Sequence, residues 1–122
     1  MQNIHDRARK LKLAAFDVDG ILTDGALYLS DSGDEIKAFF SLDGHGMKML
    51  RESGVELALI TGRKSRIVEL RAKNLGIETV YQGVEDKARA FAERAQRGLP
   101  PNSPAWQRAE DIKNANDPKE KN

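Results

Sequence analysis

The stretch Leu11-Lys12-Leu13-Ala14-Ala15-Phe16-Asp17-Val18-Asp19-Gly20 decides the fold of this chain. Its first part, 11–16, is a largely apolar run of strand length, and two aspartates and a glycine follow at once. An apolar strand that ends in carboxylates is typical of a buried strand in an open α/β sheet, where ligands bind beyond the carboxyl ends of the strands. Because side chains alternate along a strand, Asp17 and Asp19 are expected on one face. A divalent cation between them, or a proton on one of them, would relieve their repulsion.

Downstream, apolar runs of strand length alternate with segments of helical spacing. The runs 26–30 and 36–40 flank a polar turn that contains glycine, which predicts a hairpin. The other predicted elements are a short helix over 46–53, a strand over 55–60, a helix over 65–75, a strand over 77–81 and a helix over 84–97. Strands that alternate with helices at short intervals predict a parallel sheet with right-handed crossovers. The expected fold class is therefore α/β, a Rossmann-like parallel sheet with helices on both faces and a β-hairpin inserted after the first strand.

Composition excludes several classes of protein. A chain of 122 residues has room for one modest domain with a single core. Its 20 basic and 19 acidic residues nearly cancel, so charge gives no case for nucleic acid or an acidic membrane as a partner. The absence of cysteine excludes disulfides and thiolate metal sites and fits a reducing compartment. No apolar stretch has the length of a transmembrane helix or of a signal-peptide core, so a cytoplasmic location is expected.

The C-terminal part of the chain differs in character. The run Leu99 to Pro104 contains three prolines, and beyond it Trp106 and Ile112 are the only large apolar residues. Such a segment buries too little apolar surface to order itself. The expected organisation is a domain over residues 1–98 and a polar, mostly disordered tail over residues 99–122.

The paired carboxylates after the first strand fit phosphoryl transfer. Asp17 could attack phosphorus and form a covalent intermediate. Asp19 could protonate the leaving oxygen and then activate the water of the second step. A magnesium ion on the first carboxylate would offset the charge of an anionic substrate. The alternative is that both aspartates are turn residues or a helix cap, and for an isolated Asp-x-Asp that alternative is the commoner one.

Two further residues follow the next two predicted strands. Thr61 ends the strand over 55–60, where its hydroxyl and the following amides are suitable donors to a phosphoryl oxygen. Lys87 lies near a predicted helix N-terminus, where the helix dipole already favours an anion. Taken alone, Thr61 would be a helix cap and Lys87 a solvated surface charge. Their combination with the acidic pair is what indicates phosphate chemistry.

At these positions the sequence resembles the haloacid dehalogenase superfamily of phosphatases. The first motif of the superfamily matches at Asp17 to Asp24, the second at Thr61 and the third at Lys87. Within the superfamily, the resemblance is to the 3-deoxy-D-manno-octulosonate 8-phosphate phosphatase family of lipopolysaccharide sugar biosynthesis. It runs from about Leu11 to Phe91 and includes the segments Asp24-Gly25, Lys37-Ala38-Phe39, Asp43-Gly44-x-Gly46, Ile60-Thr61-Gly62-Arg63-Lys64 and Tyr81-Gln82-Gly83.

This resemblance implies a magnesium-dependent phosphomonoesterase that releases the free sugar acid and phosphate through an aspartyl-phosphate intermediate. It implies that Asp17 is the nucleophile and a metal ligand. Asp19 would be the general acid/base, contact the substrate and bind the metal through its backbone carbonyl. Thr61 and Lys87 would hold the phosphoryl group. The other residues implied in substrate binding are Phe40, Ser41, Leu42, Asp43, Gly44, Lys48, Gly62, Arg63 and Arg71. The family further implies a homotetramer joined through the hairpin.

The chain departs from the family pattern in two respects. Leu42 stands where the family has arginine, and Lys48 where it often has arginine, so a bidentate anion contact is lost. After Phe91 the family continues with a helix and a strand that ends in a Gly-Asp-Asp type motif, which supplies a further magnesium ligand. Residues 99–122 contain no apolar strand and no such motif, so the fold is expected to be incomplete at the C-terminus. The missing strand would pair with the first strand, which leaves 11–16 as an exposed edge.

Two alternative functions stay open. The first is a non-catalytic truncated fragment or an oligomerising module, which keeps the first three strands and the hairpin but lacks the chemistry. The second is the phosphatase-like domain that accompanies some sialic-acid activating enzymes. That domain shares the pattern over 17–24 and the hairpin. Leu42 slightly weakens the case for an octulosonate substrate, which keeps this second alternative open.

Overall fold

The computed structural model describes residues 3–115 of the chain. A parallel sheet with the strand order β1-β4-β5 lies at its centre. It consists of β1 (Leu13–Phe16), β4 (Glu56–Ile60) and β5 (Thr79–Tyr81). In the register of the sheet, Phe16 pairs with Leu59, and Ile60 pairs with Tyr81. The predicted α/β class with a parallel sheet is confirmed.

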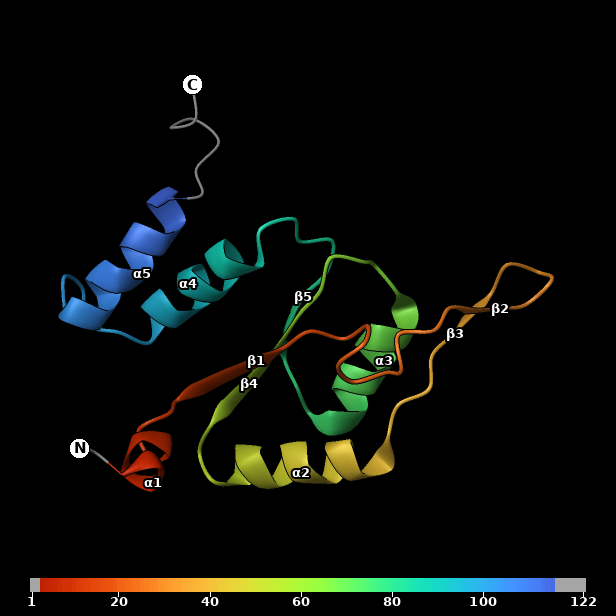
Figure 1. Cartoon of the computed structure of the whole chain (residues 1–122), viewed down its shortest axis with the longest axis horizontal. Helices are drawn as coiled ribbons and strands as arrows, with labels where there is room; N and C mark the ends of the chain where they lie inside the picture. Colours follow the sequence, from red (N-terminus) through yellow and green to blue (C-terminus); the bar gives the residue numbers. More distant parts are fainter. Residues whose placement is uncertain (1–2, 116–122) are drawn as a thin grey trace.

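Helices cover both faces of the sheet (Figure 1). On one side of the strands lie α2 (Ser41–Glu52) and α3 (Arg66–Leu75), and on the other lies α4 (Lys87–Arg97). The short helix α1 (Ile4–Ala8) precedes β1. Within residues 3–115, no helix is long and apolar enough to cross a membrane.

The core lies around the central strand β4, whose residues 57–60 are all buried because the strand has a neighbour on each side and helices on both faces. Leu59 is 1 % exposed. The buried core residues that pack together are Val18, Leu22, Met47, Leu57, Leu59, Val68, Ala72, Leu75 and Ile77. Val18 belongs to the acidic loop after β1, so this loop is anchored in the core.

Strand β1 is less buried than its apolar sequence predicts. Its only partner in the described sheet is β4, and Ala15 is exposed. Leu11, which the sequence places in the strand, lies before it and is exposed. The predicted exposed edge is therefore present in the part of the chain that the structure describes.

The predicted hairpin is confirmed, although its ladder is shorter than the two apolar runs. β2 (Tyr28–Leu29) pairs antiparallel with β3 (Glu35–Ile36). The Ser30 amide donates to the carbonyl of Asp34 at 3.0 Å and closes the turn. The hairpin projects away from the sheet beyond α3 (Figure 1).

Helix α2 begins five residues earlier than predicted, at Ser41 instead of Gly46. Glycines at 44 and 46 argue against a helix in a sequence reading, because glycine destabilises helix interiors. Here close tertiary contacts favour a glycine at the first of these positions. A Cβ atom on Gly44 would lie 2.5 Å from a guanidinium nitrogen of Arg71 and 3.0 Å from Leu75 on α3.

The prediction of a mostly disordered tail is wrong for residues 104–115, which form helix α5 (Pro104–Ala115) on α4. Gln96 of α4 donates through Nε2 to Glu110 Oε2 at 2.7 Å and accepts at Oε1 from Lys113 Nζ at 2.9 Å. Burial of Ala109 in α5 completes the contact. Docking on α4 supplies burial that the composition of the segment alone does not. Residues 116–122 of the predicted tail lie outside the described part, and a domain boundary at residue 98 stays a prediction.

Candidate active site

The loops after the three parallel strands meet at one edge of the sheet. Asp17 directly follows β1, Thr61 directly follows β4, and Lys87 is the first residue of α4 after β5. Lys87 Nζ donates to Asp17 Oδ2 at 2.9 Å, a contact between residues 70 positions apart in the chain. The structure thus brings two of the predicted site residues into direct contact.

Two backbone hydrogen bonds hold Thr61 at the end of β4. Its side chain is buried, its amide donates to the carbonyl of Tyr81 at 2.9 Å, and its carbonyl accepts from the Val84 amide at 3.1 Å. The register of β1 and β4 places Thr61 one position beyond Asp17 along the sheet. Thr61 therefore lies at the same edge as the acidic loop.

Asp17 has an environment that favours the carboxylate. Partial burial acts to raise the pKa of Asp17, but hydrogen bonds from Lys87 Nζ and from the Val18 amide, at 2.8 Å to Oδ1, outweigh it. The net result is a pKa of Asp17 below its usual value. An ionised carboxylate is the form that acts as a nucleophile and as a metal ligand.

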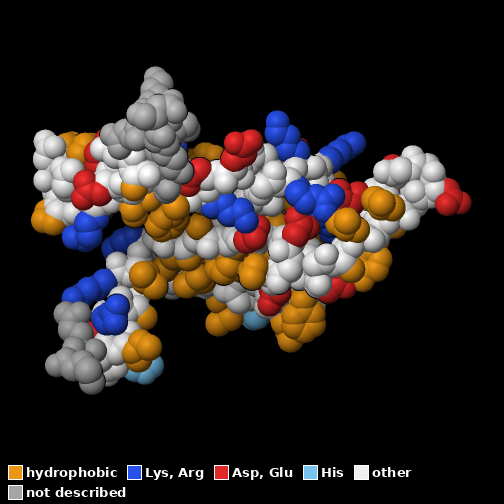
Figure 2. All heavy atoms as spheres, turned by 45° about the horizontal axis from the view of Figure 1, so that its top comes forward, with side chains coloured by type: hydrophobic (Ala, Val, Ile, Leu, Met, Phe, Trp, Pro, Cys, Tyr) orange, Lys and Arg blue, Asp and Glu red, His pale blue; other side chains and the backbone are white. Residues whose placement is uncertain are grey.

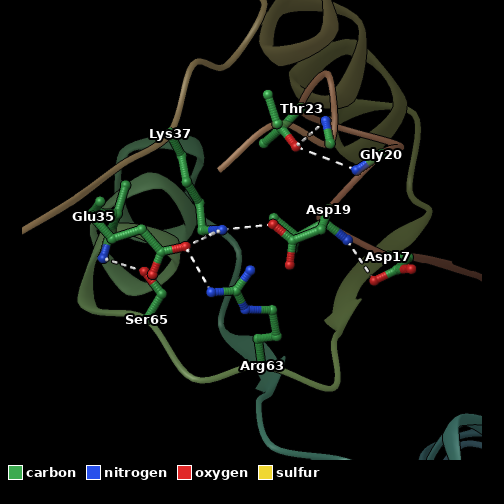
Figure 3. Close-up of polar contacts among 12 residues, drawn as sticks. Asp17, Asp19, Gly20, Thr23, Glu35, Lys37, Arg63 and Ser65 are labelled. Atoms are coloured by element: carbon green, nitrogen blue, oxygen red, sulfur yellow. Dashed lines mark hydrogen bonds and ion pairs between the residues drawn. The ribbon is translucent and has the colours of Figure 1, made fainter. Parts of the chain in front are cut away.

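Asp19 is paired with a residue to which the sequence reading assigned no role. Lys37, one residue beyond β3 of the hairpin, donates through Nζ to Asp19 Oδ1 at 2.5 Å (Figure 3). Its Nζ also lies 2.8 Å from Glu35 Oε1, and Arg63 Nη2 lies 3.3 Å from the same oxygen. Desolvation acts to lower the pKa of Lys37, but its contacts with Asp19 and Glu35 outweigh it and raise that pKa, so the lysine stays charged.

One sequence signal for this cluster exists. Glu35 and Lys37 stand two residues apart at the start of the predicted strand over 36–40, which places both side chains on one face. Their contact partner Asp19 lies 18 residues before Lys37, and no local sequence pattern indicates that Lys37 and Asp19 meet.

The acidic loop itself is fixed by short-range hydrogen bonds. Thr23 Oγ1 accepts from the amides of Gly20 and Gly25, each at 3.2 Å, and Gly20 has a φ of +79° (Figure 3). Asp24 accepts from the Ala26 amide at 2.9 Å and from the Tyr28 hydroxyl at 2.6 Å. The Tyr28 hydroxyl and the Ala26 amide lower the pKa of Asp24. These contacts tie the loop to the hairpin.

Several of the residues implied in substrate binding lie around one small cavity. Phe40, Asp43, Gly44 and Arg71 line a cavity of about 10 Å³ with other apolar residues, which leaves space for one water at most. The Arg71 guanidinium stacks over the ring of Phe39, 5.5 Å from its centroid.

The other members of the set do not line this cavity. Leu42 lines an adjoining hollow of about 350 Å³, which shares Asp43 with the cavity. Ser41 and Lys48 are exposed, as is Gly62 beside the buried Thr61. Arg63 contacts Glu35. Their roles in binding stay predictions.

Across residues 3–115, no group of three or more His, Cys, Asp or Glu side chains has the arrangement of a metal site. Asp17 and Asp19 nevertheless supply carboxylate and carbonyl oxygens, which are the ligands that Mg²⁺ prefers. Magnesium sites in phosphoryl-transfer proteins commonly use only one or two carboxylates, with water and substrate oxygens for the rest. The residues present fit such an ion.

Comparison with known proteins agrees with this fold. No model of a known protein family matches the sequence. Two curated relatives are the 3-deoxy-D-manno-octulosonate 8-phosphate phosphatases KdsC of Salmonella typhi, 40% identical over 95 residues, and of Escherichia coli strain K12, 42% identical over 91 residues. The matches cover 78% and 75% of this chain but 50% and 48% of the relatives, so the chain spans about half their length.

Solved structures give the same result. The Moraxella catarrhalis phosphatase of that name, in complex with magnesium, phosphate and KDO, has a TM-score of 0.75 and 45% identity over 80% of this chain and 56% of the other. A probable YrbI family phosphatase of Pseudomonas syringae has a TM-score of 0.73 and 55% identity, and the match covers 77% of this chain and 54% of the other. A putative haloacid dehalogenase superfamily hydrolase of Legionella pneumophila has a TM-score of 0.72 and 38% identity over 78% of this chain and 53% of the other.

Three observations together define the class of protein. They are the parallel α/β sheet with an acidic loop after its first strand, the lysine paired to that loop, and these matches. The chain has the fold of haloacid dehalogenase superfamily hydrolases and is similar to them in sequence. Within it, the chain is similar to the 3-deoxy-D-manno-octulosonate 8-phosphate phosphatases, and it spans about half the length of the curated ones.

Proposed function

We propose that this protein is a magnesium-dependent phosphomonoesterase that hydrolyses 3-deoxy-D-manno-octulosonate 8-phosphate to the free sugar acid and phosphate. The observation that carries the proposal is the 2.9 Å contact between Lys87 and Asp17 at the sheet edge that holds Thr61. Relatives named for this activity are 40% to 42% identical to the chain.

In the first step, a carboxylate oxygen of Asp17 attacks the phosphorus, and the bond from phosphorus to the sugar oxygen breaks. The electron pair of that bond stays on the sugar oxygen, which takes a proton from Asp19 and leaves as an alcohol. In the second step, Asp19 removes a proton from water, whose oxygen attacks the phosphorus of the aspartyl-phosphate. Phosphate leaves, Asp17 is again a carboxylate and Asp19 again carries its proton.

Lys87 and Thr61 act on the charge of the phosphoryl group. The ammonium of Lys87 offsets the repulsion between Asp17 and an incoming phosphate. Thr61 presents a hydroxyl from a rigid position, which orients the group for in-line attack. A magnesium ion held by the Asp17 carboxylate and the Asp19 carbonyl would add further charge neutralisation at the phosphate oxygens.

The test is release of inorganic phosphate from 3-deoxy-D-manno-octulosonate 8-phosphate, with and without magnesium. We expect turnover that requires the metal and is lost on chelation. Turnover no greater than that of the Asp17→Asn variant would contradict the proposal and favour a non-catalytic module. A profile over phosphorylated sugar acids separates the octulosonate substrate from the sialic-acid alternative.

We also propose that copies of the chain associate through the hairpin, as a homotetramer. Figure 2 shows hydrophobic side chains gathered where the hairpin leaves the body of the molecule. The side chains of four hairpin residues are between 42% and 67% exposed, namely Leu27, Tyr28, Leu29 and Ile36. A group of exposed apolar side chains is typical of an interaction surface. Light scattering is expected to give about four times the 13.6 kDa chain mass. Leu29→Asp should shift the mass toward the monomer, and a monomeric parent chain would contradict this proposal.

A cytoplasmic location stays a proposal, which rests on the cysteine-free composition.

A further inference from the structure

We propose that Lys37 is a positioning residue that holds one oxygen of Asp19 and thereby presents the other to the leaving group. The inference rests on the proposed phosphatase function and adds a role for a hairpin residue in it. Lys37 touches no reacting atom in this scheme and acts only through Asp19.

The burial of Lys37 is the first argument. Its side chain is 3% exposed, although an ammonium is costly to remove from water unless its charge is paired. Two carboxylates pair it, Asp19 at 2.5 Å and Glu35 at 2.8 Å. Arg63 at 3.3 Å from Glu35 supplies the second positive charge, so two acids and two bases balance. A buried polar network whose charges are paired is rigid, which favours a fixed position of Lys37 Nζ.

The geometry at Asp19 is the second argument. Lys37 engages Oδ1, whereas Oδ2 makes no hydrogen bond or ion pair with any described residue (Figure 3). A carboxylic acid whose proton is on Oδ2 still accepts a hydrogen bond at Oδ1. Lys37 therefore restricts rotation of the Asp19 side chain without blocking the oxygen that exchanges the proton.

The topology is the third argument. The cluster joins three separate segments, namely the acidic loop through Asp19, the hairpin through Glu35 and Lys37, and the loop after β4 through Arg63 (Figure 3). Arg63 stands two residues from Thr61. The hairpin is thereby fastened at its base to both loops that would handle the phosphoryl group.

The experiment compares two substrates in the full chain. Hydrolysis of a sugar phosphate needs a proton on its poor leaving group, whereas 4-nitrophenyl phosphate has a good leaving group and needs little assistance from Asp19. We expect Lys37→Met to lower kcat for the sugar phosphate by about 10²-fold, the lower range for general acid catalysis, with KM little changed. For 4-nitrophenyl phosphate we expect a loss below about fivefold. Lys73→Met, an exposed lysine of α3, is the matched control.

A loss of equal size on both substrates would overturn the inference, because a structural defect or a lost phosphate contact affects both alike. No loss on either would overturn it as well. Glu35→Gln removes the charge of the second partner of Lys37. We expect it to lower kcat for the sugar phosphate more than for 4-nitrophenyl phosphate, with a smaller loss than in Lys37→Met. This variant keeps the test available if Lys37→Met does not fold.

Amide hydrogen exchange separates this inference from the proposed function. If the unaltered chain hydrolyses neither substrate, the proposed function fails, and exchange alone decides whether Lys37 holds Asp19. Faster exchange at Asp19 and Gly20 in Lys37→Met, but not in Lys73→Met, supports the positioning contact. Unchanged exchange there would overturn it.

Discussion

Replacement of Asp17 by asparagine is expected to lower magnesium-dependent phosphate release by at least about a thousandfold, because loss of a covalent nucleophile removes the whole two-step route. The amide is not nucleophilic and is a poor ligand for magnesium. The carbonyl oxygen of the amide still accepts a hydrogen bond from Lys87 Nζ, which lies 2.9 Å from Asp17 Oδ2 in the parent chain. The variant therefore keeps the hydrogen bond and loses only the ionic attraction. The fold should therefore survive the change.

The measurement is phosphate release from the sugar phosphate at saturating magnesium, with circular dichroism to confirm the fold. Asp111→Asn on α5 is the matched control, since this exposed carboxylate contacts only Gln107 in the described part of the chain. We expect activity within about twofold of the parent chain for a surface change of this kind. Full activity in Asp17→Asn would place the nucleophile at another residue and would end the mechanism proposed above.

Replacement of Leu59 by alanine is expected to destabilise the chain by about 3 kcal/mol, within the range of about 2–5 kcal/mol for buried leucines. Leu59 is 1% exposed and stands in the central strand, between Phe16 on β1 and Val80 on β5. Small domains have only about 5–15 kcal/mol of stability, so the variant should unfold at a much lower urea concentration.

Urea denaturation followed by circular dichroism measures this effect, and an unchanged m-value shows that the denatured states are comparable. Leu70→Ala on α3 makes the same chemical change at a side chain that is 51% exposed, and a loss below about 1 kcal/mol is expected there. Equal losses at the two positions would contradict the assignment of β4 as the centre of the core.

The sequence predicts those elements whose signals are local. Ser65 caps α3 by accepting from the Ile67 amide at 3.3 Å, and Gly76 ends the helix with a φ of +70°. The predicted helix over 65–75 therefore agrees with the structure to within one residue. The apolar runs that become β4 and β5 are equally local, because a buried parallel strand is apolar on both faces.

Other features depend on partners that are distant in the chain. The start of α2 at Ser41 was not predicted, because Gly44 weakens a helix locally but makes room for Arg71. Helix α5 was not predicted, because its stabilising contacts lie on Gln96 of α4. The composition of a segment shows how much apolar surface the segment itself carries. It does not show which surface of another helix the segment can pack on.

The sequence by itself determined the parallel α/β class, the hairpin, and the placement of Asp17 and Thr61 at strand ends, because period and spacing act over a few residues. Only the tertiary structure decided that Lys87 pairs with Asp17, that Lys37 pairs with Asp19, and that Leu42 and Arg71 line adjoining hollows. The physical reason is distance along the chain. Contacts between residues 18 to 70 positions apart depend on how the strands register and how the loops fold back, and no local pattern encodes them.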